Sequence, residues 1–200
     1  MSKRLILASN NAKKLKELGA LLTPLGIELI PQGALDIPEA EEPFGTFVEN
    51  ALLKAREASR VSGLPALADD SGLEVDALQG APGIYSARYA GEPKSDERNN
   101  QKLLAALADC AEGQRSGRYW CVLVYLRHAE DPVPVIVQRS WEGEILAHPR
   151  GDGGFGYDPL FWLPDQGMSV AELASESKNR LSHRGRALHD LVDILKVAHG

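Results

Sequence analysis

The chain is poor in cysteine and in aromatic residues and has no excess of positive charge. Its two cysteines, Cys110 and Cys121, are too few for a disulfide framework and lack the paired spacing of a zinc site. We expect them to be small apolar residues in a reducing compartment. No apolar run approaches the roughly 18 residues that cross a bilayer, and Leu5–Ala8 is too short for the core of a signal peptide. We therefore expect a soluble, cytoplasmic protein without membrane contact.

The charge balance argues against a second class of protein, the nucleic-acid-binding proteins. Lysine and arginine number 22 and aspartate and glutamate 28, which gives a formal net charge of −6. Most affinity for nucleic acid comes from neutralising phosphates, so we expect no nucleic-acid partner, although local basic spots can hold small anions. What is present is an ordinary globular composition, 44% hydrophobic and 25% charged, without repeats or low-complexity tracts. We expect residues 1–200 to form one domain of two lobes.

The start of the chain is typical of α/β proteins. Leu5–Ala8 is a short apolar run, and Ser9, Asn10 and Asn11 supply capping chemistry for a helix beginning near Ala12. Ile27–Ile30 follows as a second strand. This strand–turn–helix–strand order predicts an α/β fold.

The remaining pattern predicts a mixed sheet flanked by helices, with two lobes sharing the sheet. Pro31–Gly45 is expected to be an exposed loop, and Thr46 with Glu49 has the pattern of a capping box. Further helices should follow Ser95 and Ser182. The expected strands are Ala66–Ala68, Leu73–Val75, a buried central strand Tyr119–Leu126, and the pair Val133–Val137 and Trp141–Leu146.

Residues 9–14 are the first candidate for chemistry. A helix start presents unpaired N–H groups and partial positive charge, which suit a phosphate. Ser9, Asn10 and Asn11 add side-chain donors, and Lys13 and Lys14 add charge. The segment is not a P-loop, and a plain capped helix with solvated lysines is the alternative.

Acidic residues form the second candidate. Asp69 and Asp70 end an expected strand and should point to different sides, so that one could bind a cation while the other anchors a turn. Mg²⁺ prefers one or two carboxylates plus substrate phosphates. A carboxylate of the first long loop (Glu39, Glu41 or Glu42) could complete this site if the loop folds over Asp70. The alternatives are an Asx turn and a solvated acidic loop.

Two segments near the C-terminus could contact a base. Residues 151–156 fit G-x-G-x-x-G literally, but no helix is expected there, so a loop presenting the Phe155 ring is the better interpretation. Such a ring can stack on a base, or it can be an ordinary core residue. Around the start of the last helix lie several basic residues, which either bind an anion or base edge or form a solvated patch: Lys178, Arg180, His183, Arg184 and Arg186.

Six segments together resemble the nonstandard purine nucleoside triphosphate pyrophosphatases, the inosine/xanthosine triphosphate pyrophosphatases. The resemblance runs in order over nearly the whole chain. The matching segments are SNNAKKLKEL at 9–18, TFVENALLKA at 46–55, ADDSGLEVDAL at 68–78, GAPGIYSARYAG at 80–91, GGFGYDPLF at 153–161 and SHRGRAL at 182–188.

The resemblance implies an elongated mixed sheet flanked by helices, with two lobes and a central cleft. It also implies a Mg²⁺-dependent homodimer that hydrolyses dITP, ITP and XTP to the monophosphate and pyrophosphate, which cleanses the nucleotide pool. Asp70 would be the proton acceptor and a Mg²⁺ ligand, with Glu41, or alternatively Glu42, as the second metal-linked carboxylate. The residues implied to bind the nucleotide are Ser9, Asn10, Asn11, Ala12, Lys13, Lys14, Lys54, Ser71, Phe155, Gly156, Tyr157, Asp158, Lys178, His183 and Arg184.

One departure falls in the first loop, where many relatives have Thr-Gly-Asn and this chain has Ser-Asn-Asn at 9–11. Asn10 can replace glycine there if its backbone is left-handed. Three other functions are weighed against the pyrophosphatase: a pyrophosphatase for other modified nucleotides, a nucleotide-binding module without catalysis, and a nicotinamide-dependent oxidoreductase.

Overall fold

A computed structural model describes residues 3–111 and 113–199. Its strands are β1 (Lys3–Leu7), β2 (Ile27–Pro31), β3 (Ala66–Val75), β4 (Ser116–Leu126), β5 (Val135–Ile145), β6 (Phe161–Leu163) and β7 (Met168–Ser169). Its α-helices are α1 (Ala12–Leu22), α2 (Phe47–Ser62), α3 (Asp96–Ala106), α4 (Ser175–Leu181) and α5 (His183–His199). The chain divides into two compact units: unit 1 comprises Met1–Asp70, Cys121–Arg139 and Arg184–Gly200, and unit 2 comprises Ser71–Trp120 and Ser140–His183.

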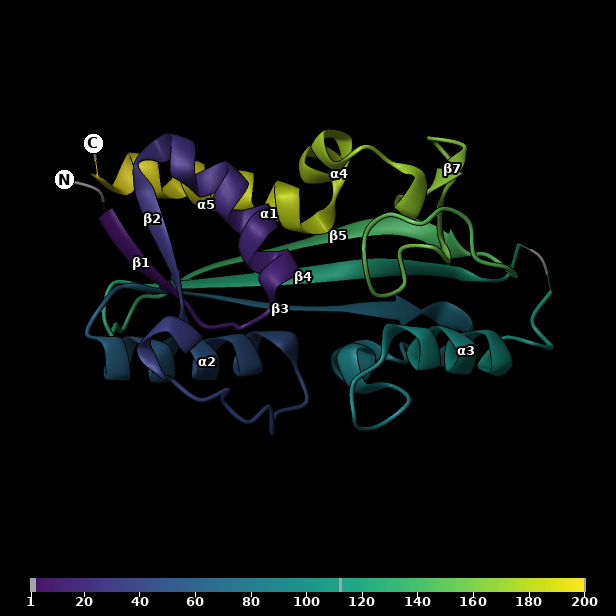
Figure 1. Cartoon of the computed structure of the whole chain (residues 1–200), viewed down its shortest axis with the longest axis horizontal. Helices are drawn as coiled ribbons and strands as arrows, with labels where there is room; N and C mark the ends of the chain where they lie inside the picture. Colours follow the sequence, from purple (N-terminus) through teal and green to yellow (C-terminus); the bar gives the residue numbers. More distant parts are fainter. Residues whose placement is uncertain (1–2, 112, 200) are drawn as a thin grey trace. The chain divides into compact units, whose positions relative to one another are not determined.

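The strands form one seven-stranded sheet in the order β2-β1-β3-β4-β5-β6-β7. β1 pairs in parallel with β2 and with β3, whereas β6 pairs antiparallel with β5 and β7. The expectation of a mixed sheet flanked by helices is therefore confirmed. In unit 1 the chain passes from β1 through α1 to β2 and then through α2 to β3, and Figure 1 shows α1 and α5 on one face of the sheet and α2 on the other.

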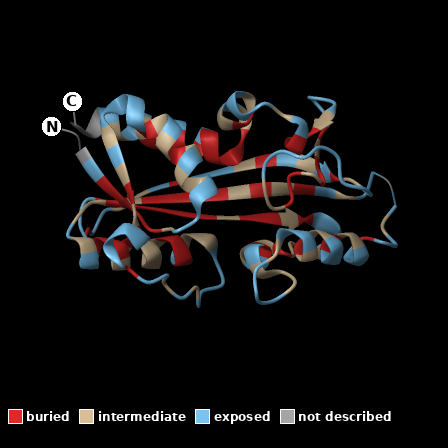
Figure 2. Ribbon diagram, in the orientation of Figure 1, coloured by how far each residue is buried: buried red, intermediate tan, exposed pale blue. Residues whose placement is uncertain are grey.

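The alternation of side chains along the strands decides which residues meet which helix. Ile6, Ala66 and Ala68 pack in one cluster with the small residues of α2 (Ala51, Ala55 and Ala58). Leu5, Leu7 and Leu67 pack in a second cluster with Leu18 of α1 and Leu188 of α5. Successive residues of a strand point to opposite faces, so both faces of β1 and β3 are buried, as Figure 2 shows by the red along these strands.

Each expected capping residue of the first three helices lies where it was predicted. Asn11 accepts hydrogen bonds from the backbone N–H groups of Lys13 and Lys14 at the start of α1. Thr46 accepts one from Glu49 at the start of α2, and Ser95 accepts one from Arg98 at the start of α3. These bonds satisfy N–H groups that the first turn of a helix leaves without intrahelical partners. The caps therefore fix where the helices begin.

Unit 2 has its own apolar core. Leu73 of β3, Leu103 of α3, Trp141 of β5 and Phe161 of β6 pack together in it. Gly143 of β5 allows the close approach of β6, because a Cβ at this position would lie 2.4 Å from Cε1 of Phe161. The core of unit 2 holds the Gly-rich segment in place, since Tyr157 and Leu160 belong to the same cluster.

Two predicted breaks in the strands are wrong. Ala66–Ala68 and Leu73–Val75 belong to the single strand β3, which runs through Asp69 and Asp70 without a turn. Asp69 and Asp70 each pair with cationic side chains that pack against the sheet, as described below. Because their charges are paired, both aspartates can lie within a buried strand and no turn is needed there. Most of Val133–Val137 and Trp141–Leu146 likewise belongs to the single strand β5, in which the intervening Gln138 and Arg139 are exposed and Ser140 is half-buried.

The shortest elements were not predicted. β6, β7 and α4 have 3, 2 and 7 residues, which is too short for a hydrophobic period to register. The segment 31–45, expected to be a loop, contains a 3₁₀ helix at Gln32–Leu35 that buries Gln32. This short helix bears on the candidate site.

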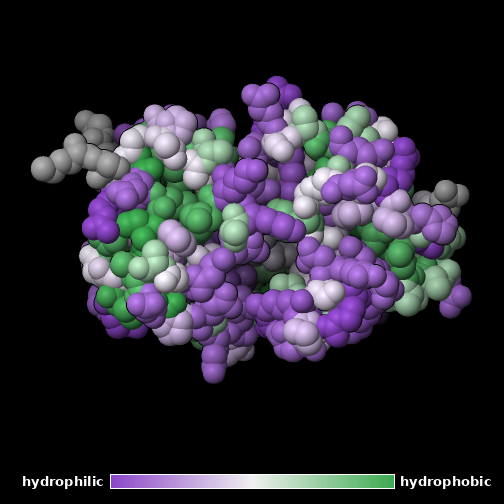
Figure 3. All heavy atoms as spheres, in the orientation of Figure 1, coloured by the Kyte–Doolittle hydropathy of each residue, from purple (hydrophilic) through white to green (hydrophobic). Residues whose placement is uncertain are grey.

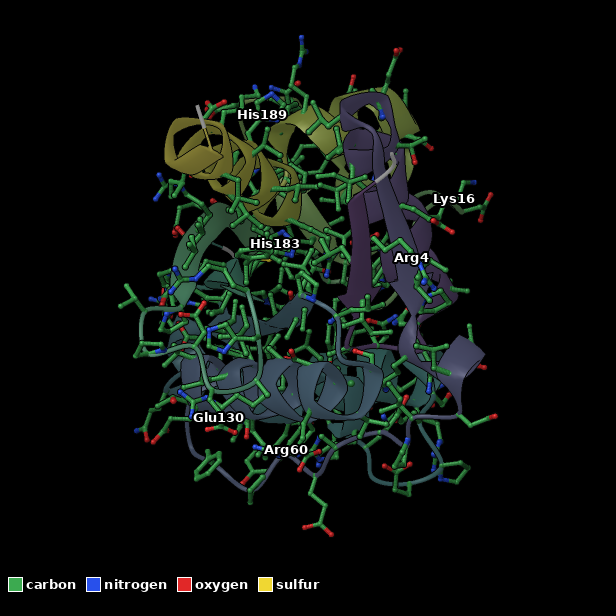
Figure 4. The ribbon with its side chains drawn as sticks, turned by 90° about the vertical axis from the view of Figure 1, so that its left-hand side faces the viewer. Arg4, Lys16, Arg60, Glu130, His183 and His189 are labelled. Atoms are coloured by element: carbon green, nitrogen blue, oxygen red, sulfur yellow. The ribbon has the colours of Figure 1, made fainter. Side chains whose placement is uncertain are left out.

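The part of the chain that the structure describes contains no helix long and apolar enough to span a membrane. Hydrophilic atoms cover much of the face seen in Figure 3, with smaller hydrophobic areas between them. Figure 4 shows Arg60 of α2 beside Glu130, with Nη2 and Oε1 3.4 Å apart. Both side chains are more than half exposed, so this pair contributes little to stability.

Candidate functional site

Asp70 and Lys54 form the first half of a charged cluster in unit 1. Asp70 continues the face of β3 that carries Ala66 and Ala68, and it therefore points toward α2. Nζ of Lys54 on α2 lies 2.8 Å from Oδ1 of Asp70 and 2.9 Å from Oε1 of Glu42. Only 11% of the Asp70 side chain and 12% of the Lys54 side chain are exposed. One ammonium group is thus held between two carboxylates, the second of which comes from the acidic loop.

Burial dominates the protonation behaviour of Asp70. Removal from water raises the pKa of the Asp70 carboxyl, and the nearby Lys54 ammonium offsets this rise only in part. Burial by itself would lower the pKa of Lys54, but the carboxylates of Asp70 and Glu42 outweigh it and raise that pKa. Lys54 therefore stays charged, and Asp70 accepts a proton more readily than an exposed aspartate does.

Asp69 forms the other half of the cluster, on the opposite face of β3. Its carboxylate lies 2.5 Å from Nζ of Lys14 on α1 and 2.6 Å from Nε of Arg184 on α5. Nη1 of Arg184 also lies 2.6 Å from Glu17 of α1. Burial would raise the pKa of Asp69, but the Arg184 guanidinium and the Lys14 ammonium together hold it well below its usual range. Asp69 is therefore an anion that ties the starts of α1 and α5 to β3.

The connection between β1 and α1 uses its two asparagines as caps of two different helices. Asn11 caps α1, and Oδ1 of Asn10 accepts a hydrogen bond of 2.8 Å from the N–H of Gly33 in the 3₁₀ helix. Oγ of Ser9 accepts a bond of 3.1 Å from the N–H of Asn11. The side-chain oxygens of Asn10 and Asn11 thus accept hydrogen bonds from the protein. The side-chain NH₂ groups of the same two residues are donors that could bind an anion. Asn10, Asn11, Ala12 and Lys13 are exposed.

A left-handed backbone at Asn10, the condition under which asparagine would replace glycine there, is not observed. Within 3–111 and 113–199, the non-glycine residues with positive φ are Asp36 and Gln79. The connection follows a path that any L-residue can adopt, and the asparagine side chain acts instead as a link to Gly33. A Cβ on Gly33 would lie 2.6 Å from Oδ1 of Asn10, so the link depends on glycine at that position.

Asp158 organises the Gly-rich loop of unit 2. Its carboxylate accepts a hydrogen bond of 2.9 Å from the backbone N–H of Phe155 and one of 3.2 Å from the Tyr119 hydroxyl. It also pairs with Nζ of Lys178 at 2.8 Å. The same ammonium lies 4.3 Å from the centre of the Phe155 ring. Lys178, predicted to contact the nucleotide, thus sits between an anion and the ring expected to stack on a base.

The next residues of this loop are bonded to other parts of unit 2. The Tyr157 hydroxyl donates to the carbonyl of Ser86 at 2.7 Å, which buries Tyr157. Both polar groups of the Gly156 residue contact α3: its N–H donates to Asp96 at 2.8 Å, and its carbonyl accepts from Asn100 at 2.9 Å. Gly156 has a φ of +61°, a conformation that favours glycine.

His183 is the first residue of α5 and belongs to unit 2. Its ring stacks on Tyr119 with centroids 4.9 Å apart and an angle of 11° between the planes. Only 5% of the residue is exposed, and Figure 4 shows it inside the packed side chains, whereas His189 lies on the outside of α5. Ser71, also predicted to bind the nucleotide, is half-buried in β3 within the same unit.

The structure thus groups the predicted residues into one set in each unit. Unit 1 holds the loop at 9–14 with Lys54, Asp70 and Arg184, and unit 2 holds Ser71, the loop at 155–158, Lys178 and His183.

Glu41 is exposed, and the alternative carboxylate, Glu42, is the one against Lys54. Sequence reasoning did not assign site roles to Glu17, Gly33, Asp96 or Asn100, whose contacts join segments far apart in the chain. Asp69 was a candidate for binding a cation or anchoring a turn, and the structure pairs it with Lys14 and Arg184 instead.

The carboxylates of unit 1 fit a hard divalent cation. The carboxylates of Asp70 and Glu42 both contact the Lys54 ammonium. The two side chains can therefore point toward the same positive charge. Within the described residues, no group of three or more histidine, cysteine, aspartate or glutamate side chains could hold a metal ion. Carboxylate oxygens are donors that a hard divalent cation prefers, and such a cation can take one or two carboxylates and its remaining ligands from phosphate and water.

Comparison with known proteins identifies the family. The model of the Ham1 family matches residues 5–194, nearly the entire chain. The chain belongs to the Ham1 family. A Ham1 protein from Coxiella burnetii with a solved structure is similar to this chain, with a TM-score of 0.90, 47% identity, and coverage of 97% of this chain and 98% of that one.

Curated relatives of this Ham1 chain carry a name that states an activity. A protein of Nitrosomonas europaea named dITP/XTP pyrophosphatase is 59% identical over 192 residues, which cover 96% of this chain and 94% of the relative. A protein of Methylococcus capsulatus with the same name is 56% identical over 200 residues, covering all of both chains. The family resemblance seen in the six sequence segments is therefore confirmed.

Proposed function

We propose that the chain hydrolyses nonstandard purine nucleoside triphosphates (dITP, ITP and XTP) to the nucleoside monophosphate and pyrophosphate, which removes these nucleotides from the pool. The observation that carries this proposal is the cluster of unit 1, in which a buried carboxylate of raised pKa, Asp70, lies against Lys54 and a second acidic side chain. A base and a cation held together in this way suit hydrolysis of a polyanion.

The phosphates are assigned to unit 1. A triphosphate carries about four negative charges, so an attacking water is repelled until these charges are neutralised. The positive end of the α1 helix dipole and the side chains of Lys13, Lys14 and Lys54 supply positive charge for this purpose. Asp70 orients a water molecule toward the α-phosphorus and takes its proton. The nucleotide is cleaved between the α- and β-phosphates.

Mg²⁺ is the proposed cofactor, held by Asp70 together with Glu42 or Glu41. When bound, it stabilises negative charge on the phosphate oxygens. The contact of Glu42 with Lys54 favours Glu42 as the second carboxylate. Replacing Glu42 by Gln, compared with the same change at Glu41, separates the two assignments by the Mg²⁺ concentration needed for half-maximal activity.

For the base, Phe155 supplies an aromatic face, and Lys178 and His183 supply donors. A donor that meets the 6-oxo group of hypoxanthine or xanthine meets another donor in adenine, and a buried donor without a partner is costly. We expect a large preference in kcat/KM for ITP and XTP over ATP. We further propose that the chain acts as a single domain, as a cytoplasmic homodimer, without a nucleic-acid partner.

A panel of nucleotides tests the proposal. Released pyrophosphate is measured for ITP, XTP, dITP, ATP, GTP and a set of modified pyrimidine nucleotides, with and without Mg²⁺. We expect rapid Mg²⁺-dependent release from ITP, XTP and dITP. A different substrate class would be favoured if ATP and GTP released pyrophosphate as fast as ITP and XTP do. Faster release from the pyrimidine nucleotides would have the same meaning. Binding without release would indicate a nucleotide-binding module.

The link between Asn10 and Gly33 predicts a specific effect on phosphate binding. Gly33→Ala places a methyl group against Oδ1 of Asn10 and displaces that side chain. We expect the inhibition constant of pyrophosphate to rise about tenfold, while thermal stability changes little because alanine suits a helical turn. The matched control is Gly19→Ala in α1, where a Cβ meets nothing within 4 Å. If pyrophosphate inhibits both variants equally well, Asn10 does not serve the phosphate site.

A further inference from the structure

Two side chains of α3 hold Gly156 through both of its backbone polar groups. The N–H of Gly156 donates to Oδ2 of Asp96 at 2.8 Å, and the carbonyl of Gly156 accepts from Nδ2 of Asn100 at 2.9 Å. Asp96 and Asn100 are four residues apart on a helix, which places them on one face, one turn apart. α3 thus fixes the orientation of a loop residue 56 to 60 positions away in the sequence.

The residue held in this way lies between the two aromatic residues of the loop. Phe155 precedes Gly156 and lies under the Lys178 ammonium, and Tyr157 follows it and donates to Ser86. Asp158 holds the loop from its other end through the N–H of Phe155. Gly156 has a φ of +61° and lies in a turn closed by the hydrogen bond from the N–H of Asp158 to the carbonyl of Phe155. Because glycine has a wide choice of backbone conformations, further bonds to its backbone restrict the turn more than they would at another residue. The contacts with α3 remove that freedom on one side of the Phe155 ring.

Asn100 does not hold this position for stability alone. Its Nδ2 donates to Gly156, but its Oδ1 is buried without a hydrogen-bond partner among the described residues. A buried acceptor left unsatisfied is destabilising, so the energetic gain from one bond is offset by the loss at the other atom. The gain that remains is the fixed direction of the Gly156 carbonyl.

We propose that Asp96 and Asn100 are positioning residues for binding of the base, which act by fixing the Gly156 backbone so that the Phe155 ring is held ready to stack on the purine. This inference rests on the proposed function. Neither residue contacts substrate. Their role is to reduce the ordering that the loop would otherwise undergo when the base binds.

The test compares ligands that carry a base with one that does not. Asn100→Ala and Asp96→Ala are made, with Gln101→Ala as the control, since Gln101 is the neighbouring exposed amide on α3 and its side chain bonds to Glu97. We expect the KM for ITP and the Kd for IMP to rise at least fivefold in both variants, with kcat changed less than twofold. The inhibition constant of pyrophosphate, which lacks a base, should stay at its wild-type value.

A conservative variant separates positioning from a structural role. Asp96→Asn keeps an oxygen that accepts from the N–H of Gly156, so its KM for ITP should return to within twofold of wild type. The Kd for IMP should rise in the two alanine variants and recover in Asp96→Asn.

Several outcomes would overturn the inference. It is wrong if the alanine variants keep the KM for ITP of Gln101→Ala, or if pyrophosphate binding weakens as much as IMP binding does. A wild-type enzyme that releases no pyrophosphate from ITP would instead contradict the proposed function, so the two failures are distinguishable. Should Asn100→Ala fail to fold, Asn100→Asp, which removes the donor and keeps the shape, replaces it with the same expected rise in KM.

Discussion

Asp70→Asn should lower kcat for ITP hydrolysis by about 10³-fold, with a change in KM of less than threefold. The amide keeps the shape of the side chain but cannot take a proton from water, and general-base catalysis contributes about 10²–10⁴-fold. Substrate binding is largely retained because Lys13, Lys14 and the positive end of the α1 dipole do not depend on the Asp70 charge. Steady-state kinetics with release of pyrophosphate as the readout gives both constants.

The control for this variant is Asp76→Asn. Asp76 is an exposed carboxylate that pairs with Arg118, and its removal should leave kcat unchanged. The pH profile adds a second readout. Burial raises the pKa of Asp70, so this carboxylate becomes protonated at a higher pH than an exposed aspartate does. As the pH is lowered, activity should therefore be lost at a higher pH than it would be with an exposed aspartate as the base. A variant Asp70→Asn with near-wild-type kcat would remove Asp70 from its role.

Asp69→Asn should lower the free energy of unfolding by about 3–5 kcal/mol, the cost of breaking a buried ion pair by removing one partner. The side chain of Asp69 is fully buried, and its replacement leaves the charges of Lys14 and Arg184 without their shared anion. Urea denaturation measures the change. For a chain of this size the melting temperature should fall on the order of 10 °C.

The matched change at an exposed pair is Asp193→Asn on α5, which pairs with Lys196 at the surface. We expect a loss of less than about 1 kcal/mol there. The folded-state pKa of Asp69 is lowered, so its stabilising contribution is fully present above about pH 4 and is lost as the pH falls below that value. A loss at Asp69 as small as that at Asp193 would show that the two cations do not depend on this carboxylate.

Much of unit 1 was predictable because its signals are local. Asn11 and Thr46 follow the chemistry of helix caps, and the short apolar runs around Leu5 and Leu67 follow that of buried parallel strands. The opposite directions of Asp69 and Asp70 follow from strand alternation alone, as predicted. The continuity of β3 could not be predicted from the sequence. Two adjacent aspartates are typical of a turn, and only the folded structure shows their cationic partners on α1, α2 and α5.

The contacts that were missed join residues far apart in the chain. Nothing near Gly33 indicates that Asn10 bonds to it, and nothing near Asp96 or Asn100 indicates Gly156. Such bonds depend on where whole elements pack, which local propensity does not encode. The second carboxylate illustrates the same limit: Glu41 and Glu42 are neighbours in one loop, and only the position of Lys54 distinguishes them.

Hydrolysis of ITP in ¹⁸O-labelled water tests the central proposal most directly, namely that the side chains of unit 1 direct water to the α-phosphorus. After a single turnover, mass spectrometry of the two products locates the label. We expect one ¹⁸O atom in IMP and none in pyrophosphate. Label in pyrophosphate would mean that water attacks the β-phosphorus, which contradicts the proposed role of Asp70.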